Sequence, residues 1–227
     1  MSSAKVVSFG NQKGGIGKST LCVTFANYLV AKGKSVRLMD CDVQRTVYDV
    51  RIQDLKKYPD MHPKYDVHCL DLNKTELLHS LLQNIKANDT SDVVLFDLPP
   101  TVEVPGINTV LANSDFIVIP YSYIRDEALS TTKFLAHLRK LRELSGGIMK
   151  AHLFLVQNRF RIQFGTAEER KVWGIVREAF MEMGDICPAI KDRADMTRYS
   201  TVVDFDKQSE IVAGTYDYII SKMFANG

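Results

Sequence analysis

A glycine-rich run near the start of the chain has the composition of a phosphate-binding loop. It reads GNQKGGIGKST from Gly10 to Thr20 and lies between an apolar run and a helical pattern, which is the order of strand, turn and helix that a P-loop requires. Glycines let the backbone turn tightly, so that successive N–H groups and the positive end of the helix face phosphate oxygens. Lys18 is placed to contact the β- and γ-phosphates, the Ser19 hydroxyl to bind Mg²⁺, and Thr20 to contact the α-phosphate.

Carboxylates follow two of the other apolar runs. The segment RLMDCDVQRT places Asp40 and Asp42 directly after one run, and DVVLFDLPP places Asp97 at the end of another. Two carboxylates separated by one residue point the same way if the strand geometry continues. An apolar strand that ends in Asp, in a chain that also has a P-loop, is the pattern of a residue that holds Mg²⁺. For Asp40 and Asp42 a role in capping a helix or a turn is the alternative.

Short apolar runs that alternate with helical patterns predict the elements that position these groups. The alternation indicates an α/β fold: a doubly wound, mostly parallel sheet of about seven strands with helices on both faces. Ligands of such sheets bind beyond the carboxyl ends of the strands. The predicted strands are Val6–Phe9, Ser35–Met39, Asp66–Leu70, Val93–Phe96, Phe116–Ile119, Leu153–Val156 and, with a weaker signal, Ile186–Ile190. The predicted helices follow Ser19 and cover the apolar positions of 77–85, 135–141, 168–177 and 209–224.

Length and composition restrict the class of protein. A chain of 227 residues, 45% of them hydrophobic, fits one domain over residues 1–227. With 29 basic and 27 acidic residues, global charge does not decide on nucleic acid binding, so any basic surface must be local. Four cysteines without a CxxC pair disfavour a zinc site and predict reduced thiols. No signal peptide or membrane span is recognisable, and we expect a soluble, cytoplasmic protein.

The loop resembles that of the ParA, Soj and MinD family of deviant Walker A ATPases, which are P-loop NTPases of the SIMIBI-like group. Gln12 stands where an ordinary P-loop has glycine, and Lys13 precedes Gly14 and Gly15, giving the sequence NQKGGIGKST. The resemblance implies that Lys13 crosses a dimer interface to the partner's ATP and acts like an arginine finger. A second lysine suits a ligand whose charge moves towards the β–γ bridge during transfer.

The carboxylate segments resemble the same family. Asp42 and Gln44 match its DxDxQ element, although Val43 replaces the proline of that element, and DLPP matches its DxPP element. The resemblance implies that Asp42 positions the attacking water, that Asp40 supports the magnesium shell, and that Asp97 holds Mg²⁺ through a water.

The carboxyl-terminal half carries a looser resemblance. In LVQNRF, Asn158 is the candidate to hydrogen-bond adenine, because an amide both donates and accepts, and a turn-forming role is the alternative. Pro188 is expected near the base, and without an NKxD element ATP is preferred over GTP. The run CPAIKDRADMTRYS resembles a ParA segment in which Lys191, Arg193 and Arg198 would contact DNA phosphates; a solvated face of mixed charge is the alternative.

The resemblance, which covers Lys5 to about Phe224, predicts a small ParA-type partition ATPase. Its ATP-bound homodimer would bind DNA nonspecifically on the nucleoid, and a ParB-like partner would stimulate hydrolysis, to segregate a plasmid, a chromosome or a mobile element. The P-loop begins near residue 10, which leaves no room before it for a helix-turn-helix domain. The predicted catalytic set is Lys13, Lys18 and Asp42, the nucleotide set is Gly14, Gly15, Ile16, Gly17, Lys18, Ser19, Thr20, Asn158 and Pro188, and the magnesium set is Ser19, Asp40 and Asp97.

Three alternatives remain. A MinD-like membrane-cycling ATPase would end in a basic amphipathic tail, but the end SKMFANG has one basic residue, so no membrane partner is expected. A metabolic enzyme of the same fold, such as a dethiobiotin synthetase-like ligase, is disfavoured by Lys13. An adaptor with a degenerate pocket is disfavoured because Lys18, Ser19, Asp42 and Asp97 are all present.

Overall fold

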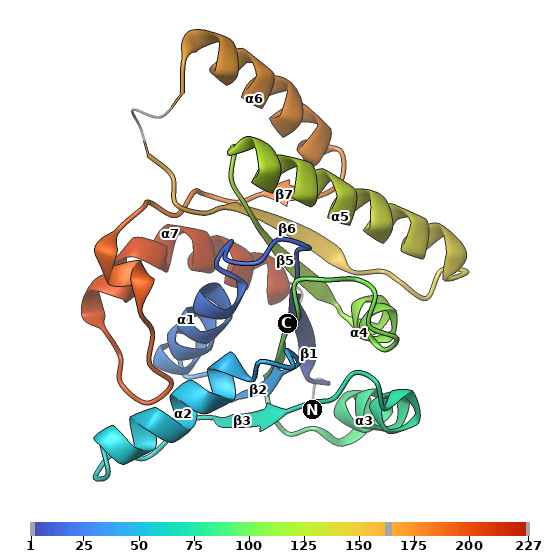
Figure 1. Cartoon of the computed structure of the whole chain (residues 1–227). Helices are drawn as coiled ribbons and strands as arrows, with labels where there is room; N and C mark the ends of the chain where they lie inside the picture. Colours follow the sequence, from blue (N-terminus) through green and yellow to red (C-terminus); the bar gives the residue numbers. More distant parts are fainter. Residues whose placement is uncertain (1–2, 162–164, 226–227) are drawn as a thin grey trace.

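The computed structural model describes residues 3–161 and 165–225, which form a layered α/β structure (Figure 1). Within these residues seven strands form one sheet in the order β3-β2-β4-β1-β5-β6-β7, and each strand pairs in parallel with its neighbours. This confirms the predicted fold class. The strands are β1 (Lys5–Phe9), β2 (Val36–Asp40), β3 (Asp66–Cys69), β4 (Val93–Asp97), β5 (Phe116–Tyr121), β6 (His152–Gln157) and β7 (Asp185–Ile186).

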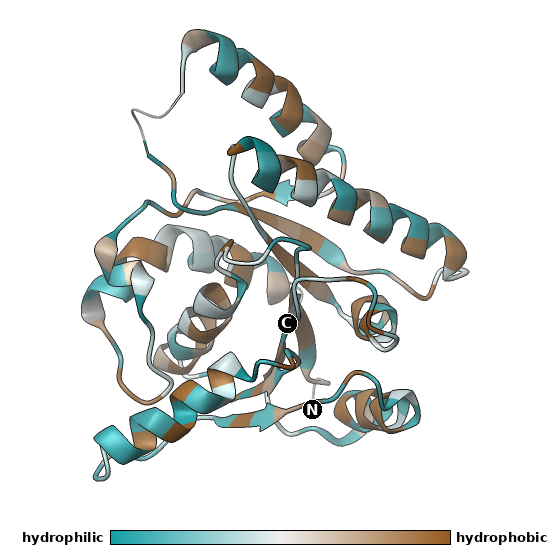
Figure 2. Ribbon diagram, viewed as in Figure 1, coloured by the Kyte–Doolittle hydropathy of each residue, from teal (hydrophilic) through white to brown (hydrophobic). Residues whose placement is uncertain are grey.

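Helices cover both faces of the sheet (Figure 1). Alternate strand residues enter two different hydrophobic clusters. Val6 packs on the side of α3 (Thr75–Asn88), α4 (Ile107–Asn113) and α5 (Arg125–Leu144), and Val7 packs on the side of α1 (Lys18–Ala31) and α7 (Asp206–Met223). Side chains of a strand point to opposite faces in turn, so a continuously apolar strand fits a sheet covered on both sides, as the colouring of Figure 2 illustrates. The helices are α1 (Lys18–Ala31), α2 (Thr46–Lys57), α3 (Thr75–Asn88), α4 (Ile107–Asn113), α5 (Arg125–Leu144), α6 (Ala167–Met181), η1 (Ala194–Thr197) and α7 (Asp206–Met223).

The structure departs from the predicted elements at three places. Helix α2 was not predicted, because its buried positions include Arg51 and Asp54 instead of an apolar stripe. The short helix α4 was also not predicted. Strand β7 was expected over Ile186–Ile190 but ends at Ile186, since Pro188 has no N–H to give to a ladder. No helix of the described ranges is long and apolar enough to cross a membrane.

The strand order brings the predicted site together. Strand β4 lies between β1 and β2, and its last residue, Asp97, pairs in register with Phe9 on one side and with Asp40 on the other. The glycine-rich loop leaves the sheet directly after Phe9. Since the carboxyl ends of parallel strands share one edge of the sheet, the loop and the carboxylates lie at the same place.

Candidate nucleotide-binding site

The backbone of the glycine-rich loop has the form of an anion cradle. Gly15 and Gly17 adopt φ values of 75° and 101°, a left-handed conformation that costs glycine little. Helix α1 begins at Lys18, and its first helical hydrogen bond runs from the Leu21 amide to the Gly17 carbonyl. The amides of residues 18–20 therefore have no partner within the helix, and together with the helix dipole they attract an anion.

The loop is fixed from the β5 side by Asn11, which is buried. Its side-chain amide donates to the Pro120 carbonyl at 2.8 Å and to the Thr131 hydroxyl at 2.9 Å, and its Oδ1 accepts from the Lys13 amide at 3.3 Å. These bonds hold the start of the loop in place before any ligand binds, so less ordering has to accompany binding.

Lys18 and Asp97 are two buried ionisable groups of the site. The Lys18 ammonium donates to the Lys13 carbonyl at 3.2 Å. Burial lowers the pKa of Lys18, and the nearby carboxylates of Asp97 and Asp42 oppose this effect. Burial also raises the pKa of Asp97 to about 7, while a hydrogen bond with Ser19 acts in the opposite direction. Lys18, Ser19, Asp42 and Asp97 thus lie close enough to interact.

One oxygen of Asp97 lacks a hydrogen-bond partner. Among the described residues nothing donates to Oδ1, although Asp97 is only 1% exposed. An orphaned buried carboxylate oxygen requires an explanation, and a divalent cation supplies one. The Ser19 hydroxyl and the Asp97 carboxylate are the hard oxygen donors that Mg²⁺ prefers, so the residues present fit a magnesium ion.

Asp40 accepts three backbone hydrogen bonds. Its Oδ1 accepts from the Asp42 amide at 3.2 Å, and its Oδ2 accepts from the amides of Val47 and Tyr48, each at 3.0 Å. These are the bonds of a carboxylate that caps the first turn of α2, the alternative that the sequence left open. Asp40 therefore fixes the turn that carries Asp42, and its place in the magnesium shell stays a prediction.

Asp42 lies in the turn between β2 and α2. Its Oδ1 accepts from the Gln44 amide at 2.9 Å, and its carbonyl accepts from the Arg45 amide at 2.9 Å. The carboxylate is half-buried and keeps acceptor capacity free for a water molecule. The next residue, Val43, is 76% exposed, so an apolar side chain lies on the surface beside the site.

Asn158, at the end of β6, braces the loop from the other side. Its Nδ2 donates to the Ile16 carbonyl at 2.9 Å, and its Oδ1 accepts from the Arg159 amide at 3.0 Å. A Cβ atom added to Gly17 would lie 2.3 Å from this Nδ2, so glycine is required there for the close approach. One N–H and one lone pair of Asn158 remain for a base, and the contact with adenine stays a prediction.

The three candidate DNA-binding residues do not share one environment. Lys191 and Arg193 line a small cavity of about 50 Å³ with Gly17 and Thr20 of the phosphate loop, whereas the Arg198 guanidinium lies 5.1 Å from the Phe205 ring centroid. Lys191 and Arg193 therefore lie beside the predicted position of the base.

Pro188 was predicted to lie near the base. It is not among the described residues that line this small cavity. Its carbonyl accepts a hydrogen bond from the Thr215 hydroxyl at 2.8 Å, so the backbone at this position is tied to α7. The contact with the base stays a prediction.

Arg159 is a loop contact that the sequence analysis did not identify. It adopts a left-handed φ of 55°, and its guanidinium donates to the Gly15 carbonyl at 2.7 Å. Its position directly after Asn158 was the available signal. The two neighbours hold successive carbonyls of the loop, at Gly15 and Ile16.

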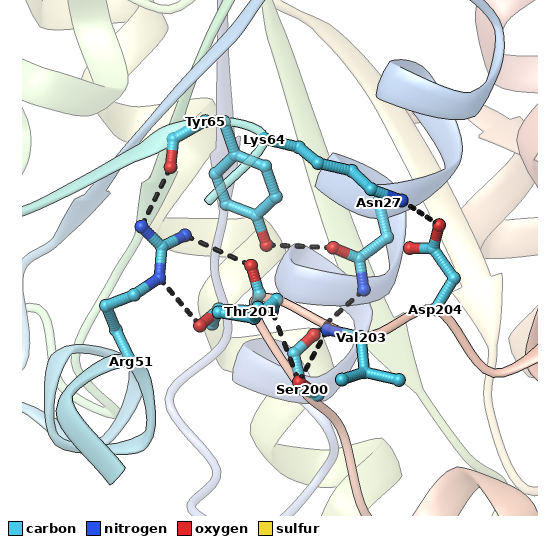
Figure 3. A network of polar contacts seen from close by, with 9 residues as sticks. Asn27, Arg51, Lys64, Tyr65, Ser200, Thr201, Val203 and Asp204 are labelled. Atoms are coloured by element: carbon cyan, nitrogen blue, oxygen red, sulfur yellow. Dashed lines mark hydrogen bonds and ion pairs between the residues drawn. The ribbon is translucent and has the colours of Figure 1, made fainter. Parts of the chain in front are cut away.

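The sequence analysis also did not predict a buried polar network that joins α1 and α2 to residues 200 and 201 (Figure 3). The Arg51 guanidinium, on α2, donates to both the hydroxyl and the carbonyl of Thr201 and to the Tyr65 carbonyl. Asn27, on α1, donates to the Ser200 carbonyl. The network ties the first two helices to the segment that follows the candidate DNA-binding residues.

Comparison with known proteins gives consistent matches. Residues 7–213 match the sequence profile of the CobQ/CobB/MinD/ParA nucleotide binding domain. The chain is 30% identical over 156 residues to the chromosome-partitioning ATPase Soj of Treponema pallidum, a match that covers 56% of this chain and 61% of that protein.

Solved structures share the fold. A plasmid partition protein of Borrelia burgdorferi bound to AMPPNP superposes with a TM-score of 0.71 at 20% identity, over 99% of this chain and 100% of that one. Cobyrinic acid a,c-diamide synthase of Mycobacterium smegmatis, with a bound ATP analogue and magnesium, superposes with a TM-score of 0.69 at 18% identity, over 97% and 95%. Those proteins bind nucleotide on the same arrangement of sheet and helices.

Proposed function

We propose that this chain, which belongs to the CobQ/CobB/MinD/ParA family of nucleotide-binding domains, is a ParA-type partition ATPase that hydrolyses ATP to ADP and phosphate. The family membership predicted from the phosphate loop is confirmed; the activity is our inference. The observation that carries it is the orphaned Oδ1 of buried Asp97, beside Ser19 and Lys18 at the phosphate loop. Residues 1–227 are taken as one ATPase domain.

The chain's own groups suggest how the reaction proceeds. The loop amides and the Lys18 ammonium hold the β- and γ-phosphates, and Asp42 orients the attacking water. The water oxygen bonds to the γ-phosphorus while the bond from that phosphorus to the bridging oxygen of ADP breaks, and the attacking water gives up one proton to an oxygen of the released phosphate or to solvent. Ser19 and Asp97 would hold Mg²⁺, and the ion would supply neutralisation of the phosphate charge at this site.

Lys13 supports a dimeric mechanism. Its backbone is fixed, because Asn11 accepts from its amide and Lys18 donates to its carbonyl. Among the described residues no side chain pairs with its ammonium, so this charge is free to reach a second ATP. We propose that two chains face each other across two ATP molecules and that Lys13 of each contacts the partner's nucleotide.

DNA and a ParB-like protein are the proposed partners of the ATP-bound dimer. The Soj relative and the partition protein of similar fold support this reading through their names. Of the three candidate DNA contacts, Arg198 is the one that does not line the cavity beside the phosphate loop, whereas Lys191 and Arg193 both line it. Binding to nonspecific DNA would place the ATP form on the nucleoid and leave the ADP form in the cytoplasm.

The test measures phosphate release by the purified chain alone, with nonspecific duplex DNA, and with anionic liposomes. We expect DNA retention only with Mg·ATP, and an affinity that falls steeply with salt because counterions are released. Equal DNA binding without nucleotide would refute the switch, and stimulation by liposomes instead of DNA would favour a MinD-like membrane cycle.

Variants assign the DNA surface. Arg198→Ala should weaken DNA binding while ATP affinity stays at the parent value, and Lys140→Ala, on the exposed face of α5, is the matched control. For Lys191→Ala and Arg193→Ala, ATP affinity is measured alongside DNA affinity, because these residues line the cavity beside the phosphate loop and either change can also affect nucleotide binding.

A further inference from the structure

A second cavity opens between the start of α5, the end of β6 and α6. Its volume is about 660 Å³, within the range of roughly 300–1,000 Å³ that small-molecule sites have. Among the described residues that line it there is none from the phosphate loop itself; it shares only Asn158, Arg159 and Asp192 with the small cavity beside that loop. Figure 1 shows α6 beside α5 at the edge of the molecule, away from α1.

Arginines dominate the polar lining of this cavity. Arg161 is neutralised by Asp192. The other three donate to neutral acceptors of the described residues: Arg159 to the Gly15 carbonyl, Arg170 to the Gly165 carbonyl, and Arg177 to the Met181 sulfur. The second acid of the lining, Glu127, accepts from the Ser122 hydroxyl. The cavity therefore has an excess of positive charge in the form of guanidinium groups, whose planar fork matches phosphate.

The rest of the lining is aromatic and apolar. The rings of Tyr123 and Trp173 lie nearly parallel, with their centroids 5.1 Å apart and an angle of 11° between their planes. Phe160 also lines the cavity, and Ile124 adds an aliphatic side chain that is 50% exposed. Flat aromatic ligands pack well against such surfaces, and base–aromatic contacts of this kind tolerate any base because every base has a flat face.

We propose that this cavity is a second binding site, for a nucleotide unit, with its phosphate on the arginines and its base against the Tyr123–Trp173 wall. The unit is either a free mononucleotide or a nucleotide at the end of a single strand. A single strand or mononucleotide fits better than an acidic peptide, since a nucleotide brings both a phosphate for the guanidinium groups and a flat base for the aromatic lining, whereas an acidic peptide brings only carboxylates.

The site is connected to the phosphate loop through Arg159. This guanidinium lines the cavity and also donates to the Gly15 carbonyl. A phosphate that engages Arg159 competes with that carbonyl, so occupancy of the cavity changes how firmly the loop is held. A ligand here therefore modulates ATP binding at the first site.

Trp173 makes the proposal directly testable, because it is the only tryptophan of the 227 residues and it lines the cavity. Tryptophan fluorescence is followed while the full chain is titrated with AMP and, separately, with a short oligothymidylate; equilibrium dialysis of each labelled probe measures binding independently. Lys18→Ala, which removes ATP binding at the phosphate loop, should retain the response. This variant separates a failure of the second site from a failure of the ATPase proposal.

Paired variants identify the site. Changing Arg170→Ala together with Arg177→Ala should weaken probe binding by roughly tenfold or more, as expected when hydrogen bonds to charged groups are lost. Lys171→Ala removes the same charge from an exposed neighbour on α6 that does not line the cavity, and should leave binding unchanged. If the alanine pair fails to fold, Arg170→Lys with Arg177→Lys keeps the charge and loses the planar fork, and should still weaken binding.

The outcomes are distinct. Binding of AMP supports a free nucleotide as ligand, and binding of oligothymidylate without AMP supports a single strand. Absence of binding by both probes in dialysis overturns the proposal. So does an alanine pair that binds as tightly as the parent, or a response to polyglutamate that neither nucleotide probe produces.

Discussion

Arg51 donates two hydrogen bonds to Thr201, which lies 150 positions later in the sequence. Nε donates to the hydroxyl at 2.7 Å, and Nη2 donates to the backbone carbonyl at 3.2 Å. Asp54, one turn further along α2, accepts from the Thr201 amide at 2.7 Å. Helix α2 starts from the turn that Asp40 caps. The segment after the candidate DNA-binding residues is therefore fastened to the helix that follows Asp42.

The first prediction concerns this contact. Arg51→Met should lower the free energy of unfolding by about 2–4 kcal/mol, because buried carbonyls of Thr201 and Tyr65 lose their donor and Asp54 loses a nearby cation. Urea unfolding followed by circular dichroism measures it. Arg139→Met is the matched control: that arginine is exposed and pairs with Glu143 one turn away, a contact that contributes about 0.3–0.5 kcal/mol. Equal losses in the two variants would contradict the role of the buried network.

The second prediction concerns pH and Asp97 in chain freed of metal and nucleotide. Burial raises the pKa of Asp97 from 3.8 to about 7, so between these values the folded chain keeps a proton that the unfolded chain releases. The contribution of Asp97 to stability is therefore full at low pH and is lost as pH rises towards 7, by up to roughly 4 kcal/mol. Asp97→Asn should remove this loss and be more stable than the parent at pH 8.

The control for Asp97 has the opposite sign. A backbone hydrogen bond from Ser35 lowers the pKa of Asp92, so its contribution is present above pH 3.8 and is lost as pH falls. Asp92→Asn should therefore be less stable than the parent at neutral pH, and the difference should shrink in acid. Urea midpoints at a series of pH values separate the two cases. If the free energy of unfolding of Asp97→Asn changes with pH in parallel with that of the parent, burial does not raise the pKa of this carboxyl group.

The third prediction separates binding from chemistry at Asp42. Asp42→Ala should bind ATP with near-parent affinity, since the phosphates are held by Lys18 and the loop amides. It should hydrolyse ATP about 10²–10⁴-fold more slowly, as expected for loss of a group that orients and polarises water. Single-turnover phosphate release and equilibrium nucleotide binding give the two quantities. Asp49→Ala, on the exposed face of α2, is the control, and turnover of Asp42→Ala within a few-fold of the parent would exclude the role.

The fourth prediction contrasts the two lysines of the loop. Lys18→Ala should abolish ATP binding. Lys13→Gln should leave the ATP affinity of the monomer almost intact and abolish dimerisation and hydrolysis, because two facing triphosphates repel without the crossing cations. Isothermal titration and light scattering measure these effects. Mixing Lys13→Gln with Lys18→Ala should restore some hydrolysis if Lys13 acts across the interface. Normal dimerisation and turnover by Lys13→Gln alone would eliminate a role across the interface.

The fold could be predicted because its strands carry local signals. Each strand is a short apolar run, and parallel pairing follows from alternation with helices. Helix α2 gave no such signal, since Arg51 and Asp54 are buried against partners about 150 positions away. The role of Asp40 in the site also could not be predicted from local sequence. Whether it faces a metal or caps a helix depends on where α2 begins, which the spacing from Asp40 to Asp42 does not determine.

Both edges of the sheet are short: β3 has four residues and β7 has two. Short edge strands present few unpaired backbone groups, so copies of the chain are poorly suited to join by adding strand to strand. This reduces the hazard of aggregation for a protein that is proposed to meet its own copies repeatedly. In the proposed dimer, association is left to the loops at the carboxyl ends of the strands, where a ligand that is consumed would govern it, so the contact would be reversible.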